Sequence, residues 1–100
     1  MESIERITEM EQRLNLIRTA LDQAEASLEQ LSEALEESSP LMDYYGSDDY
    51  HDDVQAMEEN RLPDDLRCGV LTEDAVFDIF VDQRNLLVEL LKVATRLAEA

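Results

Sequence analysis

A run of six residues near the middle of the chain has the side chains best suited to chemistry, since residues 48–53 read DDYHDD. On a helix, Asp48 lies one turn from Asp52 and Asp49 one turn from Asp53, so paired carboxylates could bind a hard divalent cation. Structural zinc would need more nitrogen or sulfur ligands, and a calcium loop would need a glycine and a bidentate glutamate at fixed offsets. Neither pattern is present, so we expect a solvated acidic face, with weak cation binding as the alternative. The candidate ligands are Asp48, Asp49, His51, Asp52 and Asp53.

Two further groups of reactive side chains lie in the middle third. Cys68 is the single cysteine, and no histidine stands with it in a recognisable motif, so we expect a small buried filler rather than a nucleophile. Tyr44, Tyr45 and Tyr50 could stack on a ligand or a partner, but we expect them to close the end of a helical hairpin with their hydroxyls at the surface. We therefore predict that the protein is not an enzyme and uses no cofactor.

Composition predicts one small folded domain over residues 1–100. Hydrophobic residues make up 44% of the chain, too many for a disordered acidic tail, although the formal net charge is −17. Eight acids and three arginines give residues 1–35 a charge of −5, eleven acids and one arginine give residues 36–65 a charge of −10, and six acids and four bases give residues 66–100 a charge of −2. The −10 segment would repel phosphate groups, so we expect no direct binding to nucleic acid or to a membrane.

The ends of the chain and its cysteine usage predict a cytoplasmic protein. The N-terminus, MESIERITEM, is charged from its second residue, and no apolar run approaches the roughly 18 residues of a membrane span. A single cysteine cannot form an intrachain disulfide and fits a reducing compartment.

The elements that must position these groups begin with a heptad repeat in the first third. Its spacing of three and four residues places nine apolar side chains on one stripe, the pattern of a coiled-coil seam. We predict a helix over about residues 3–37, with Ser3 as a possible N-cap and Ser38-Ser39-Pro40 ending it. Ala20, Ser27 and Ala34 keep one edge of the seam small, which lets a second helix approach closely. The nine positions are Ile7, Met10, Leu14, Ile17, Leu21, Ala24, Leu28, Leu31 and Leu35.

A second long helix is predicted over about residues 72–98. Thr72 is a suitable N-cap, and Glu73 and Asp74 suit the positive end of the helix dipole. One apolar stripe follows Phe80, Leu87, Leu90, Ala94 and Leu97, and a second edge follows Ile79, Leu86 and Val93. A stripe this wide indicates contact with more than one neighbour.

Between the long helices, residues 38–71 are predicted to form short helices in an irregular acidic segment. Gly46-Ser47 closes a turn and caps a helix over about residues 48–59, with Tyr50, Val54 and Met57 on one side. Pro63 opens a further short turn, Gly69 ends it in the left-handed conformation, and Val70 and Leu71 fold back onto the core.

The same middle segment carries a resemblance to a known family. The matching residues are Tyr44-Tyr45-Gly46-Ser47, Tyr50, Asp53, Leu62-Pro63 and residues 65–78, of which LRCGVLTED is the most specific part. The chain resembles a small bacterial family described only as a domain of unknown function (DUF4298), with mild departures. The family is expected to have tryptophan at Tyr50, serine at Thr72 and tyrosine at Phe77. The resemblance implies a bacterial, helical, cytoplasmic protein and supplies neither an activity nor site residues.

These patterns together predict an all-α fold, in which two long helices form an antiparallel hairpin and short helical segments pack across one end. The seam of the first helix has two possible partners, the last helix of the same chain or another chain, and we favour packing within the chain. The Ile79, Leu86 and Val93 edge can then still serve a dimer in a four-helix arrangement.

For function, the sequence favours a non-enzymatic interaction or adaptor protein that forms homo-oligomers, with a dimer favoured, or that binds another protein. The alternative is an acidic decoy or regulator that binds a basic protein surface and mimics nucleic acid. The predicted interaction residues are Ile7, Leu14, Leu21, Leu28, Ile79, Leu86 and Val93.

Overall fold

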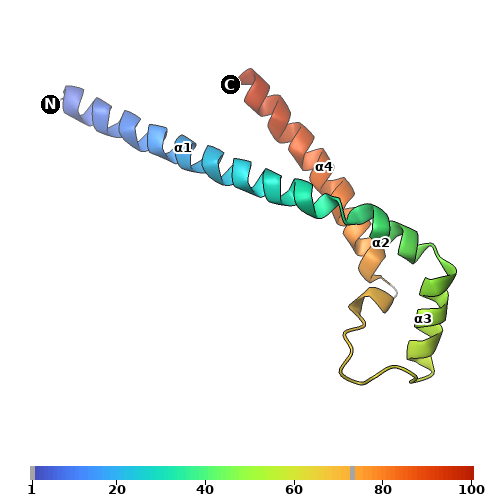
Figure 1. The fold of residues 1–100 in the computed structure, drawn as a ribbon. Coiled ribbons are helices and arrows are strands. Elements are labelled where there is room, and N and C mark those ends of the chain that lie inside the picture. Colours follow the sequence, from blue (N-terminus) through green and yellow to red (C-terminus); the bar gives the residue numbers. More distant parts are fainter. Residues whose placement is uncertain (1, 73) are drawn as a thin grey trace. The chain divides into compact units, whose positions relative to one another are not determined.

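The structure, a computed structural model, describes residues 2–72 and 74–100 and is all-α in that part of the chain (Figure 1). It contains four α-helices and one 3₁₀-helix and no strand among these residues. The chain divides into two compact units, residues 1–39 and residues 40–100, which are described separately below. The all-α prediction is confirmed, whereas the hairpin of the two long helices and the single domain stay predictions.

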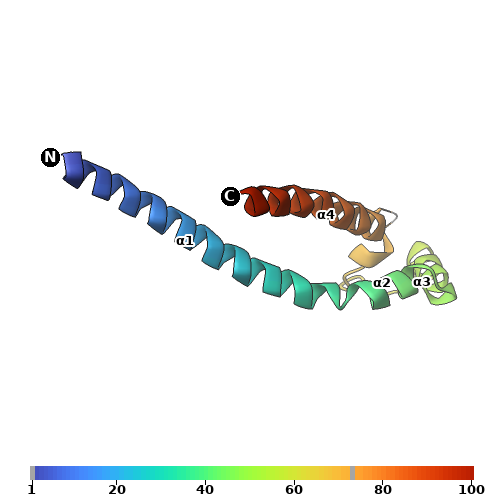
Figure 2. The ribbon, with the colours of Figure 1, turned by 90° about the horizontal axis from the view of Figure 1, so that it is seen from above.

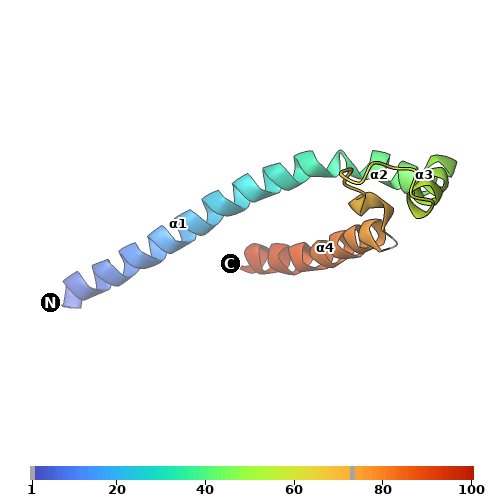
Figure 3. The ribbon, with the colours of Figure 1, turned by 90° about the horizontal axis from the view of Figure 1, so that it is seen from below.

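Helix α1, Glu2–Leu35, is continuous over 34 residues and carries the whole heptad repeat. Figures 2 and 3 show it as one uninterrupted helix. Its sequence contains no glycine or proline to break the backbone hydrogen-bond ladder. The prediction of Ser3 as the N-cap is wrong, because Ser3 lies inside the helix and its hydroxyl accepts a hydrogen bond from Arg6 at 3.4 Å. Every residue of α1 except Leu31 is exposed.

The end of α1 lies slightly earlier than predicted and has a different cause. Glu36 and Glu37 form a turn in which their N–H groups donate to the carbonyls of Glu33 at 3.2 Å and Ala34 at 3.0 Å. Ser38-Ser39-Pro40 does not end a helix but opens a new one, α2, Ser38–Tyr45. Pro40 is tolerated there because the N–H groups of the first turn have no partner within the helix. Proline also cannot donate to the carbonyl of Glu36, which explains why the two helices do not merge.

Helix α3, Asp48–Glu58, confirms the predicted helix of the acidic run and its cap. Ser47 is the N-cap: its hydroxyl accepts a hydrogen bond from the Tyr50 N–H at 3.2 Å and donates one to the Tyr44 carbonyl at 2.6 Å. At the other end Asn60 takes the left-handed conformation, with φ of 57°, and the Arg61 N–H closes the helix on the Ala56 carbonyl at 2.9 Å. Asn60 is thus the residue of this segment with left-handed backbone conformation, and the sequence did not predict it.

The predicted left-handed Gly69 is wrong, since no described glycine has a positive φ. Residues 63–66 form a single turn, closed by the Leu66 N–H on the Pro63 carbonyl at 3.2 Å. Gly69 instead starts the 3₁₀-helix η1, Gly69–Leu71. Thr72 caps the C-terminal end of η1, and its hydroxyl donates to the Gly69 carbonyl at 2.7 Å.

Helix α4, Ala75–Glu99, starts three residues later than predicted. Thr72 is not its N-cap, because that hydroxyl is used by η1; Asp74 occupies the N-cap position without a side-chain hydrogen bond. The predicted role of Glu73 lies outside the described residues. Beyond Gln83 every residue of α4 is exposed.

The core of the described residues is small and lies where η1 contacts both α3 and α4. Its members are Tyr50 and Ala56 from α3, Leu71 from η1 and Val76 from α4. Leu71 is 6% exposed, which confirms that it folds back onto the core, whereas Val70 beside it is 36% exposed. The predicted apolar side of α3 is confirmed: Tyr50 is buried, and Val54 and Met57 are half-buried.

Replacing Ser47 by alanine should lower the free energy of unfolding of the 40–100 unit by about 1 kcal/mol, because the N-cap hydrogen bond to Tyr50 is lost. Tyrosine fluorescence during urea unfolding is the appropriate measurement, since all three tyrosines lie at positions 44, 45 and 50. Ser27→Ala, an exposed site inside α1, is the control and should leave this transition unchanged. Equal transitions for the two variants would show that the cap does not stabilise α3.

Candidate functional site

Three tyrosines from α2 and α3 form an aromatic cluster. The ring centroids of Tyr44 and Tyr50 are 5.6 Å apart at an interplanar angle of 86°, and those of Tyr45 and Tyr50 are 5.1 Å apart at 58°. Edge-on and tilted arrangements of this kind are the favourable ones for aromatic rings. Tyr50 is the centre of the cluster and is only 8% exposed, so the rings join α2 to α3. Whether they also close the end of a hairpin stays a prediction.

The sequence predicted a surface hydroxyl for Tyr44. In the structure this hydroxyl instead donates a hydrogen bond to Oδ2 of Asp53 at 2.6 Å. That hydrogen bond, with smaller contributions from partial burial and from the negative charge of Asp53, raises the pKa of Tyr44 to about 12. Asp53 therefore links α3 to α2 through Tyr44.

The other candidate ligands of the acidic run are spread along the solvent side of α3. Asp48, Asp49 and Asp52 are exposed, and the ring of His51 packs edge-on against Tyr50 with centroids 6.0 Å apart. Over residues 2–72 and 74–100 no group of three or more histidine, cysteine, aspartate or glutamate side chains could hold a metal ion. The geometry thus gives no support to the weak-cation alternative.

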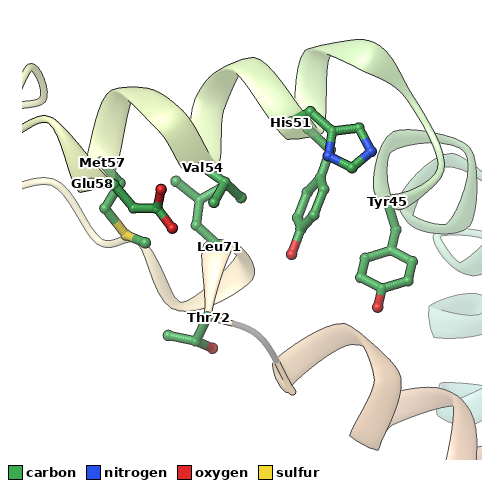
Figure 4. A pocket seen from close by; sticks show the side chains of 8 residues that line it. Tyr45, His51, Val54, Met57, Glu58, Leu71 and Thr72 are labelled. Atoms are coloured by element: carbon green, nitrogen blue, oxygen red, sulfur yellow. The ribbon is translucent and has the colours of Figure 1, made fainter.

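An open pocket of about 660 Å³ lies beside the aromatic cluster. Aromatic and aliphatic side chains line it together with the polar groups of His51 and Thr72, and Glu58 is the lining side chain that carries a negative charge. Figure 4 shows side chains of α3, including His51, Val54 and Glu58, along one side of the pocket, with Leu71 and Thr72 facing them and Tyr45 at one end. The lining residues are Tyr45, Tyr50, His51, Val54, Met57, Glu58, Leu71 and Thr72.

A smaller pocket of about 250 Å³ is lined by Tyr44 and by Leu71, and Leu71 also lines the larger pocket. Cys68 lines it and is half-buried, with its thiol donating to the Leu66 carbonyl at 3.5 Å. His51 lines the larger pocket and not this one, so the two pockets do not pair the thiol with that histidine. The prediction of Cys68 as a small buried filler is only partly right, since the side chain is half-buried and lines this pocket.

The predicted interaction residues are all exposed, each within its own unit. In α1, Leu14 is 58% exposed and Leu28 is 50% exposed; in α4, Val93 is 57% exposed. Ile7, Leu21, Ile79 and Leu86 are exposed as well. Ion pairs on the same helices are weak and solvated, such as Arg18 with Asp22 at 3.7 Å and Lys92 with Glu89 at 3.2 Å. Among the described residues, no helix is long and apolar enough to cross a membrane.

Comparison with known proteins identifies the family. The family described as Domain of unknown function (DUF4298) matches residues 7–93. The chain belongs to the DUF4298 family. Neither a curated protein nor a solved structure matches it. The DUF4298 match starts at Ile7 of the heptad repeat and ends at Val93 of the α4 edge, so it includes the tyrosine cluster, both pockets and all seven predicted interaction residues.

Sequence reasoning predicted no pocket, but the spacing of Tyr50, Val54 and Met57 placed these three of the larger pocket's eight lining residues on one side of a helix. It missed Glu58 and Thr72 as lining residues. Glu58 is one turn beyond Val54, so the same spacing could have included it. Thr72 was assigned to the cap of the following helix, and no local signal separates the two roles.

The raised pKa of Tyr44 makes stability depend on pH in the alkaline range. The tyrosine of the unfolded chain loses its proton near pH 10, and the folded one near pH 12, so the stabilisation is complete below about pH 10 and disappears as the pH rises toward about 12. Asp53→Asn should lower the pKa of Tyr44 toward the ordinary value, as measured by ultraviolet titration of tyrosinate. Asp52→Asn removes the same charge from an exposed site and should leave the high pKa in place; equal effects of the two variants would contradict the assignment.

Proposed function

We propose that this protein is a non-enzymatic protein–protein interaction module that associates with itself through the apolar faces of its long helices. The observation that carries the proposal is the exposure of the heptad stripe, in which Leu14, Ile17 and Leu28 are each at least half exposed. Surface leucines are ordinary when scattered, but a contiguous apolar stripe on one face marks an interaction surface.

The energy available from burying this stripe is comparable with that of the small core among the described residues. Fully burying one leucine or isoleucine side chain contributes about 1.5 to 3 kcal/mol. Four core residues are buried among those described, whereas α1 alone presents nine exposed large apolar side chains. Seven of these nine side chains lie on the heptad stripe, so association would add apolar burial comparable with that of the described core.

The chemistry of the pockets supports a non-enzymatic role. The thiol of Cys68 and the imidazole of His51 line different pockets, so the described residues do not join this nucleophile to this base. A half-buried, unpaired Cys68 also suits the reducing cytoplasm, where we place the protein.

Charge placed on the stripe should abolish association. We expect the unmodified chain, of 11.5 kDa, to give at least twice that mass by light scattering after size exclusion, at both low and high salt. Leu14→Glu combined with Leu21→Glu should return the mass to that of one chain, because a buried unpaired carboxylate is strongly unfavourable. Gln12→Glu combined with Thr19→Glu adds the same two charges on the opposite side of α1 and should keep the larger species. A monomeric unmodified chain would overturn the proposal.

A second function is favoured by the larger pocket: binding of a basic protein surface by the acidic middle segment. The pocket combines the rings of Tyr45 and Tyr50 with the carboxylate of Glu58, within a segment whose formal charge is −10. Aromatic faces attract the charged end of lysine or arginine, and their edges and the aliphatic wall suit the methylene stem. We infer that the pocket accepts a cationic side chain from a basic partner.

An arginine-rich peptide is a direct probe of this second function, with affinity measured by calorimetry at about 50 mM and about 300 mM salt. Screening should weaken binding by about tenfold over this range. Glu58→Gln should weaken it further by several-fold, whereas Glu29→Gln, the same change on exposed α1, should have little effect. Equal losses for the two variants, or binding that ignores salt, would exclude the pocket as the recognition site.

A further inference from the structure

We propose that α1 pairs antiparallel with α1 of a second copy, in the one register that places Leu21 opposite Ala24. This inference rests on the proposed self-association and adds the orientation, the register and the residues that select them. It takes the place of the hairpin expected from the sequence, because the same grid cannot pack against α4 and against a second copy at once. It is argued from the continuity of α1, the apolar grid that it exposes and the charges beside that grid.

The apolar grid fits an antiparallel pair without a gap. In such a pair each core layer consists of one grid residue from each copy, and the two residue numbers add up to the same value in every layer. A sum of 45 pairs Met10 with Leu35, Leu14 with Leu31, Ile17 with Leu28, and Leu21 with Ala24. Each layer occurs twice by symmetry, so eight of the nine grid positions of both copies are used. Shifting the pair by one heptad, to a sum of 38, also uses eight grid positions of each copy and leaves Leu35 facing Ser3. A shift of two heptads, to a sum of 31, leaves Leu28 facing Ser3 and gives Leu31 and Leu35 no opposite residue.

The charges beside the grid select among the registers. In an antiparallel pair the residues that directly follow the second apolar position of each heptad face one another; in α1 these include Glu11, Arg18 and Glu25. In the proposed register Arg18 faces Glu25 of the second copy, twice. In the register with a sum of 38, Arg18 faces Arg18 and Glu11 faces Glu25, so every charged contact is repulsive.

Two separate charge repulsions disfavour a parallel pair. Arg13 would face Arg18 of the second copy, twice, although Arg6 would face Glu11. The −10 segments that begin at Glu36, directly after α1, would also leave the pair at the same end. Antiparallel pairing places these segments at opposite ends of the pair. The two helix dipoles then point in opposite directions, and this arrangement is electrostatically favourable.

The opposite edge of the grid is compatible with a close antiparallel approach. There Ala20 faces Ser27 of the second copy, and Arg13 faces Ala34, so neither contact adds a clash or a repulsion. Arg18 is available for the pair, because its ion pair with Asp22 within α1 is long, at 3.7 Å, and both side chains are about two-thirds exposed.

Charge reversal tests the orientation through the sign of the effect. Arg18→Glu should raise the dissociation constant of the dimer by about tenfold, and adding Glu25→Arg should return it to within about threefold of the starting value. Arg13→Glu makes the same change of net charge at a position that faces Ala34 and is the control, with little effect expected. If Arg18→Glu lowers the dissociation constant, the pair is parallel. If adding Glu25→Arg does not restore the dissociation constant, the pair has another register. Either outcome would overturn the inference.

Disulfide trapping tests the register directly. In a Cys68→Ser background, Leu21→Cys and Ala24→Cys chains are mixed and oxidised mildly, and the cross-linked products are identified by mass spectrometry. Antiparallel pairing in this register gives the mixed disulfide between positions 21 and 24, whereas parallel pairing gives each chain joined to its own kind. A dimer without the mixed disulfide overturns the register and leaves self-association intact, while a monomer by light scattering overturns both proposals.

Discussion

Burial of Leu71 is the interaction on which the folded 40–100 unit depends. It is the buried side chain of η1, the short helix that contacts both α3 and α4, and it lines both pockets. Tyr50 on one side and Val76 on the other complete the buried set with Ala56. Because η1 contacts both helices and Leu71 lines both pockets, the position of η1 shapes each pocket.

The acidic run shows how a structural interaction can occupy a residue that looks suited to chemistry. Asp53 accepts the Tyr44 hydrogen bond, and His51 turns toward the tyrosine rings, so the carboxylates that remain on α3 are spread along its solvent side. The segment therefore acts as a dense negative surface beside an aromatic pocket. Negative charge at the start of α3 also suits the helix dipole, which gives Asp48 and Asp49 a role in stability.

Much of the fold could be predicted from the sequence, because periodicity and caps are local. The heptad repeat located α1, Ser47 located the start of α3, and the apolar pattern after Ala75 located α4. The errors arose where two local signals compete. Pro40 ends a helix or sits in the first turn of one, Gly69 suits a left-handed cap or the start of a 3₁₀-helix, and Thr72 can cap either of two elements. For Gly69 and Thr72 the outcome depends on the packing of η1 against α3 and α4, which the local sequence does not reveal. The pairing of Tyr44 with Asp53 is likewise invisible in sequence, because it depends on the angle between α2 and α3.

The short reach of the core contacts would separate folding in time from the assembly proposed above. Leu71 follows Tyr50 by 21 residues and precedes Val76 by five, so the loops that must close to form the 40–100 core are short. Short loops cost little entropy to close, and structures built from local contacts fold rapidly at a rate independent of concentration. Pairing between copies is bimolecular and follows mass action. The amount of paired protein would then follow the abundance of the chain, so that gene expression alone could set how much apolar helix surface remains open to other partners.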